Sequence, residues 1–99
     1  FVKNANGYLR VDYENILFLK SDNVYIDIVD VNKKTHVIRA TISEYADKLD
    51  SNFLRIHRGY IINLKYLEKL DFANATVFGH TIPIGNKYKE DLMSRIQKG

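Results

Sequence analysis

The sequence predicts a mainly β fold with two short helices. Runs of β-branched and aromatic residues recur along the chain between polar or glycine-containing turns, which is typical of antiparallel strands. Apolar residues follow a helical period near residues 41–50 and again near residues 86–97. The 99 residues, 45% hydrophobic and 27% charged, suffice for one modest hydrophobic core. We therefore expect residues 1–99 to form a single domain.

The first forty residues are predicted to form a meander of four or five antiparallel strands, covering residues 1–3, 8–13, 16–19, 24–31 and 35–39. Asn6-Gly7 is a strong signal for a two-residue hairpin turn, because both residues tolerate positive φ. The continuous apolar run Ile16–Leu19 indicates a strand covered on both faces. Lys20–Asn23 and Asn32–Lys34 are predicted to be polar turns.

A helix is predicted to follow the meander and to end near residue 50. Its apolar face consists of residues spaced i, i+3, i+4 and i+7, namely Ile42, Tyr45, Ala46 and Leu49. Thr41 and Glu44 have the spacing of a capping box, with Thr41 at the N-cap. A short helix with such a stripe is expected to cover a sheet.

The stretch Phe53–Asn63 changes its pattern in the middle. It starts as an alternating strand with two sets of side chains, Leu54 and Ile56 on one face and Phe53, Arg55 and His57 on the other. Arg58-Gly59 then interrupts the alternation, before Tyr60–Ile62 resumes an apolar run that we expect in the core. A cationic corner between apolar segments is costly to bury, so we expect it to project from a rigid base. Such a corner suits an anion, for example nucleic acid phosphate.

The remaining residues predict three more strands and a terminal helix. The strands are expected at residues 65–72, 76–78 and 81–84, with turns at residues 73–75 and at Gly79-His80. Pro83 has no N–H to donate, which indicates an edge strand. The helix opens at Gly85-Asn86 with Asn86 as a candidate N-cap, and its apolar face contains Tyr88, Leu92 and Ile96.

Enzyme, metal and cofactor chemistry leave no recognisable pattern in this sequence. The chain has no cysteine, its three histidines lack the paired spacing of a zinc site, and its five glycines form no phosphate loop. No apolar run approaches the ~20 residues of a membrane span. The net charge is +3, and the basic excess lies after position 50, where eight lysines and arginines face four carboxylates. We therefore expect no catalysis, cofactor, metal or small-molecule substrate.

Residues 53–63, with the pattern Phe-x-Arg-x-His-Arg-x-Tyr-Ile-Ile-Asn, resemble the signature of the LytTR DNA-binding domain family. This family is the output module of bacterial response regulators of the LytR/AgrA/AlgR type. Three further motifs fit it in order: Ile16–Leu19 followed by a polar turn and Asn23–Tyr25, then Arg39-x-Thr41-Ile42, then Ile82–Ile84. The resemblance covers about residues 3–97.

The resemblance implies an elongated, mostly antiparallel fold that inserts loops into successive major grooves of double-stranded DNA. By position in the motifs, it implies three contact regions, which contain Lys20 and Asn23, His57 and Arg58, and Asn86 and Lys87. Arg58 is expected to read guanine, since a guanidinium contacts O6 and N7 together. His57 and Lys87 are expected to hold phosphates, and Asn23 to contact a base edge.

The chain departs from the family pattern at two positions. Many members have serine where Gly59 stands and arginine where Asn86 stands. Asn86 either reads adenine or caps the last helix, and a cap requires nothing outside the chain.

Several residues have structural interpretations beside the functional ones. Arg55 is expected to be an ion-pair partner rather than a DNA contact, with Asp27 as the candidate carboxylate. Tyr25 is expected to pack across strands rather than to stack on a base. Lys33-Lys34 is expected to solubilise a hairpin rather than to touch the DNA backbone.

The family also implies a cellular setting. The implied setting is a cytoplasmic, two-component phosphorelay in which a receiver domain and its histidine kinase act upstream of promoter binding. A second copy of the domain is expected on a repeated DNA site. The chain starts at Phe1 rather than Met, so we expect the domain to be the C-terminal part of a longer regulator. The alternative function is a β-rich protein-interaction or sensory module whose basic corner binds an acidic partner.

Overall fold

The structure, a computed structural model, describes residues 2–4 and 7–97. Within this part of the chain, the larger sheet has five strands in the order β5-β4-β3-β7-β6, and each neighbouring pair is antiparallel. These strands are β3 (Ile16–Asp22), β4 (Tyr25–Asp30), β5 (Thr35–Arg39), β6 (Phe53–His57) and β7 (Tyr60–Asn63). The strand β3 is therefore central, and β5 and β6 form the two edges.

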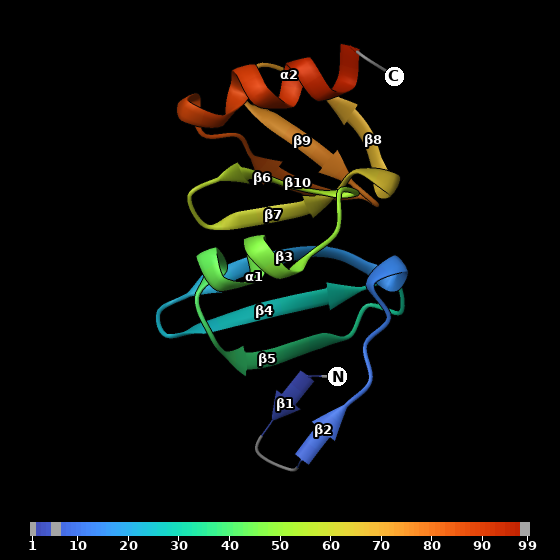
Figure 1. Cartoon of the computed structure of the whole chain (residues 1–99). Coiled ribbons are helices and arrows are strands. Elements are labelled where there is room, and N and C mark those ends of the chain that lie inside the picture. The colour runs from blue at the N-terminus through green and yellow to red at the C-terminus, as the bar shows by residue number, and fades with distance from the viewer. Residues whose placement is uncertain (1, 5–6, 98–99) are drawn as a thin grey trace.

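A smaller antiparallel sheet of the described residues has the order β10-β9-β8, with β8 (Leu67–Leu70), β9 (Asn74–Val77) and β10 (His80–Pro83). A separate hairpin joins β1 (Val2–Asn4) to β2 (Gly7–Leu9). The helices in these residues are α1 (Ile42–Lys48) and α2 (Lys89–Gln97), with 3-10 turns η1 (Tyr13–Asn15), η2 (Leu64–Tyr66) and η3 (Asn86–Tyr88). The molecule measures 41 × 24 × 21 Å, so the prediction of an elongated, mainly β fold is confirmed (Figure 1).

The central strand β3 separates two hydrophobic clusters. Ile16 and Leu19 belong to the cluster under α1, which contains Ile42. Leu17 and Phe18 belong to the other cluster, which includes Leu92 of α2 and the inner residues of β9 and β10. All four residues of this run are buried, so the predicted coverage of both faces is confirmed.

Local signals for helix α1 are confirmed. The Thr41 hydroxyl accepts a hydrogen bond from the Glu44 N–H at 3.2 Å, and the Glu44 carboxylate accepts one from the Thr41 N–H at 3.3 Å. This is the predicted capping box, and it fixes where the chain leaves β5 and enters α1.

Three predictions in the first meander need correction. The strand predicted at residues 8–13 ends at Leu9, because the chain bends into η1 and the Asn15 N–H donates to the Asp12 carbonyl at 3.0 Å. The turn predicted at Lys20–Asn23 is shorter, since β3 continues to Asp22 opposite Tyr25. Asn23, at φ 56°, and Val24 alone make that turn. Of the predicted Asn6-Gly7 turn, Gly7 begins β2 and Asn6 lies outside the described residues.

Turns in the smaller sheet also differ from the prediction. The Asp71 carboxylate accepts the N–H groups of Ala73 and Asn74 at 2.8 Å each, which places the turn at residues 71–73 instead of 73–75. The next turn is Phe78-Gly79, both at positive φ, so His80 already belongs to β10. The strand predicted at residues 65–72 is shortened by η2 to Leu67–Leu70. Pro83 lies on the outer strand β10, as predicted.

The start of the terminal helix is different as well. Gly85 is the N-cap of η3 and no side chain caps this turn, so the prediction that Asn86 is an N-cap is wrong. Helix α2 begins only at Lys89, and the predicted apolar face is partly wrong because Ile96 is exposed while Leu92 is buried.

Candidate nucleic-acid interface

Three turns lie together at one end of the strands, on the left in Figure 1. They are Asn23-Val24 between β3 and β4, Arg58-Gly59 between β6 and β7, and Gly85–Lys87 at the entry to α2. The Ser21 N–H donates to the Gly59 carbonyl at 2.8 Å, and the Gly85 N–H donates to the Ile56 carbonyl at 2.8 Å. We call this row of three turns the turn edge. The structure thus brings together all three regions that the sequence singled out.

Arg58 is exposed at the tip of the β6–β7 turn. The side chain of Arg55 donates hydrogen bonds to main-chain carbonyls of this turn. The Arg55 guanidinium donates to the Arg58 carbonyl at 2.5 Å and to the His57 carbonyl at 3.4 Å. It also donates to the Ser43 hydroxyl at 3.2 Å, which connects the turn to α1. Arg55 therefore has a structural role in positioning the main chain beneath Arg58.

The partner predicted for Arg55 is wrong. Asp27 lies in β4, opposite Lys20 on one side and Val37 on the other. In residues 2–4 and 7–97, the ion pairs are Arg10–Asp12 and His36–Asp30, so Arg55 pairs with no described carboxylate. Carbonyl and hydroxyl oxygens take the place of the expected carboxylate.

His57 is half-buried in the same turn and is oriented from two sides. Its Nδ1 accepts the Gly59 N–H at 3.0 Å, and its ring meets Tyr60 edge-on, with 5.5 Å between centroids. Because Nδ1 accepts, the proton of the neutral ring is carried by Nε2. This leaves one N–H donor for an oxygen outside the turn.

The first contact region is divided between a strand and a turn. Lys20 is exposed but lies within β3, directly opposite Asp27 and Tyr60. Asn23 occupies the turn itself in the left-handed conformation, with its side chain exposed. Asn23 therefore lies on the turn edge, whereas Lys20 lies on the sheet face behind it.

The third region combines two exposed residues with a half-buried aromatic ring. Asn86 and Lys87 are exposed at the start of η3. The Tyr88 ring lies 5.8 Å from the Arg55 guanidinium carbon and 6.0 Å from the Lys87 ammonium, so cation–π attraction connects this region to β6. Sequence reasoning missed this role of Tyr88, because Arg55 and Tyr88 are far apart in the chain.

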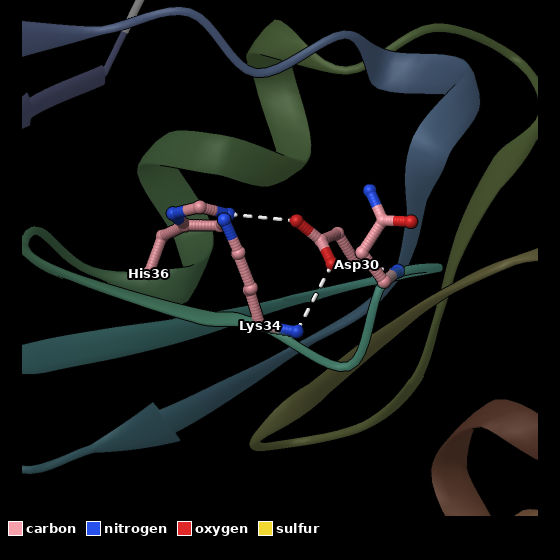
Figure 2. A network of polar contacts seen from close by, with 4 residues as sticks. Asp30, Lys34 and His36 are labelled. Atoms are coloured by element: carbon pink, nitrogen blue, oxygen red, sulfur yellow. Dashed lines mark hydrogen bonds and ion pairs between the residues drawn. The ribbon is translucent and has the colours of Figure 1, made fainter.

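A partly buried polar network lies at the opposite end of β4 (Figure 2). One oxygen of Asp30 contacts the His36 Nε2 at 2.9 Å, and the other accepts the N–H groups of Asn32 at 2.9 Å and Lys34 at 3.1 Å. Burial raises the pKa of Asp30, but the His36 contact and the two N–H donors together outweigh burial and lower it. This network holds the β4–β5 turn, and Lys33-Lys34 lies there, away from the turn edge.

The described residues contain neither a cluster of metal-ligating side chains nor a membrane-length apolar helix. No group of three or more histidines and carboxylates is placed to hold a metal ion in this part of the chain. Among the same residues, no helix combines the length and the apolar character that crossing a membrane requires.

Comparison with known proteins identifies the family. The sequence model of the LytTr DNA-binding domain matches residues 6–97. Among solved structures, the chain is similar to the LytTr DNA-binding domain of a putative methyl-accepting/DNA response regulator from Bacillus cereus. The TM-score is 0.80 at 16% identity, over 94% of this chain and 91% of that chain. No curated protein matches. The predicted resemblance is thus confirmed: the chain belongs to the LytTr DNA-binding domain family.

Proposed function

We propose that this domain binds double-stranded promoter DNA sequence-specifically, by placing its turn edge against successive major grooves. The observation that carries this proposal is the placement of Asn23, Arg58 and Asn86 on three adjacent turns. Hydrogen bonds from the Ser21 N–H to the Gly59 carbonyl and from the Gly85 N–H to the Ile56 carbonyl join two of these turns to neighbouring strands. The turns follow one another along the long dimension of the molecule, which is 41 Å (Figure 1). Successive major grooves on one side of B-DNA lie about 34–36 Å apart, a distance comparable with the length of the whole molecule.

Each side chain of the turn edge has a role that fits its chemistry. Arg58 reads guanine through two parallel N–H donors, and Asn23 contacts a neighbouring base edge. Asn86 reads adenine through its amide, and the structure favours this over helix capping because Gly85 is the N-cap. His57, Lys87 and, further back, Lys20 hold phosphates, which positions the domain without reading sequence.

The proposed wider setting is supported by the family and by the similar structure, which is a domain of a putative methyl-accepting/DNA response regulator. We propose that residues 1–99 are the output domain of a cytoplasmic response regulator in a two-component phosphorelay. A receiver domain upstream, phosphorylated by its histidine kinase, then controls binding of two copies to a repeated promoter site. The domain itself supplies no catalysis and uses no cofactor or small-molecule substrate.

The proposal is tested by fluorescence anisotropy with a labelled random-sequence duplex. At low salt the domain should bind the duplex, and added salt should release it, because phosphate contacts displace condensed cations. Selection from a random duplex pool should then yield one enriched motif. If the domain fails to bind DNA at low salt yet binds an acidic peptide, it is instead a β-rich protein-interaction module.

A further inference from the structure

We propose that Arg39 is a fourth contact of the turn edge and holds a DNA phosphate beside the Asn23-Val24 turn. This inference rests on the proposed function and extends the interface by one residue beyond the three regions described above. It starts from the register of the larger sheet. Arg39, the last residue of β5, lies directly opposite Tyr25, and Tyr25 is the first residue after that turn.

The position of β5 makes Arg39 the outermost residue of the row. Directly opposite residues of an antiparallel pair have Cβ atoms about 4.5–5.5 Å apart, so the Arg39 side chain starts within reach of the turn. Because β5 is the edge strand of the described five-stranded sheet, no strand pairs with Arg39 on its outer side. The residue is exposed, and its side chain shares a sheet face with Tyr25.

A hollow of about 410 Å³ separates Arg39 from the turn. Its lining residues are Asn23, Val24, Arg39, Ala40, Thr41 and Glu44. The Glu44 carboxylate also lines the hollow, and its Oε1 is directed to the helix cap, where it accepts from both the N–H and the hydroxyl of Thr41 at 3.3 and 3.1 Å. Arg39 forms no ion pair with any carboxylate of residues 2–4 and 7–97. Among the described residues, the Arg39 guanidinium and the Asn23 amide are therefore the side-chain donors beside this hollow that have no acceptor.

A phosphate group is the anion that fits this place. Guanidinium groups bind phosphate through two parallel hydrogen bonds, and Arg39 presents such a group in line with the turns that carry Asn23 and Arg58. The carboxylate of Asp22 lies on the same sheet face, beyond Tyr25. It is about two strand spacings, or ~9.5 Å, from Arg39, and the two residues form no ion pair. Lys87 and Arg39 then hold phosphates at the two ends of the edge, with the base-reading residues between them.

The test compares Arg39→Ala with the parent on cognate and random-sequence duplexes over a range of salt concentrations. The slope of log Kd against log salt should decrease by about 0.9, the value for one lost phosphate contact. Affinity should fall about threefold to tenfold for both duplexes alike, and the selected base motif should stay unchanged. Arg39→Gln keeps the length of the side chain and should show the same change of slope, which separates charge from folding.

Arg10→Ala is the matched control. Arg10 is also exposed, but it pairs with Asp12 at 3.0 Å and lines a hollow with Asp30, at the far end of β4. Its removal should leave the slope at the parent value. An unchanged slope in Arg39→Ala and Arg39→Gln, with the parent still binding DNA, would overturn the inference, as would a changed base motif. A parent domain that binds no duplex at all would instead overturn the proposed function.

Discussion

The Ser21 N–H donates to the Gly59 carbonyl at 2.8 Å, which fixes the β6–β7 turn to the central strand β3. Residues on either side of this bond carry the proposed base contacts, since Asn23 follows Ser21 by two residues and Arg58 precedes Gly59. The spacing of the two contacts is therefore set by the separation of paired strands, about 4.7–4.9 Å, rather than by flexible loops. A site of this kind is positioned before DNA arrives.

We predict that the guanidinium of Arg55 stabilises the β6–β7 turn. Arg55→Lys keeps the charge but loses the planar fork that reaches two carbonyls and the Ser43 hydroxyl. We expect the free energy of unfolding to fall by about 1–2 kcal/mol and DNA affinity to fall with it, measured by urea denaturation and anisotropy. Ser43→Ala removes a single bond and should cost less. If Arg55→Lys bound DNA and unfolded like the parent, this stabilising role of Arg55 would be refuted.

The elements that were predicted correctly are those determined by residues close together in the sequence. The continuous apolar run Ile16–Leu19 predicts burial on both faces of its strand. The capping box of α1 joins Thr41 and Glu44, which lie within one helical turn of each other. Turn positions were wrong by one to three residues, because strand pairing decides them: Asp22 pairs with Tyr25 and leaves two residues for the turn. Sequence patterns show roughly where a turn is needed, but they do not show at which residue the hydrogen-bond ladder between two strands ends.

The contacts that assemble the site were not predictable in the same way. Arg55 was recognised as structural, but its partner Ser43 lies in another element twelve residues earlier. The Gly85 N–H donates to the Ile56 carbonyl, at the place where β6 shifts register between Arg55 and His57. A β-bulge of this kind leaves a backbone group free of the ladder, and no side-chain pattern announces it. The candidate contact residues themselves came from the family motif rather than from periodicity.

Arg58 and Lys87 should differ in how their removal affects DNA binding. Arg58→Ala should cost about 1–3 kcal/mol of specific affinity and relax the preference at one base position, because a bidentate base contact is lost. Lys87→Ala should weaken binding to all sequences alike and flatten the salt dependence. Lys65→Ala, in η2 at the far end of β7, serves as the control for charge. Equal affinity of Arg58→Ala and the parent for the cognate duplex would remove its base-reading role.

The two glycines of the turn edge should respond differently to an added side chain. A Cβ at Gly59 would lie 3.6 Å from the Ser21 Cβ and 3.8 Å from the His57 Nδ1, which are ordinary contacts. Gly59→Ser should therefore change the free energy of unfolding by less than about 0.5 kcal/mol.

A Cβ at Gly85 would lie 3.1 Å from the Tyr88 ring, so this ring, which contacts Arg55 and Lys87, must shift. Gly85→Ser should cost about 1 kcal/mol or more, because an overpacked site strains its neighbours. Thermal denaturation of the two variants side by side checks this order. A lower melting temperature for Gly59→Ser than for Gly85→Ser would contradict it.

Asp30 should make the stability of the domain depend on acid pH. Its pKa is lowered in the fold, against burial, by His36 and by the N–H groups of Lys34 and Asn32. The unfolded state therefore binds the proton more tightly, so Asp30 stabilises the fold above its unfolded pKa of about 3.9 and loses this contribution as pH falls through the folded pKa. Asp30→Asn cannot titrate but retains an oxygen for both N–H donors. Urea midpoints between pH 6 and pH 2.5 should consequently fall more steeply for the parent than for Asp30→Asn. Other carboxylates, including Asp71, are present in both proteins, so the difference between the two curves isolates Asp30; parallel curves would refute its role.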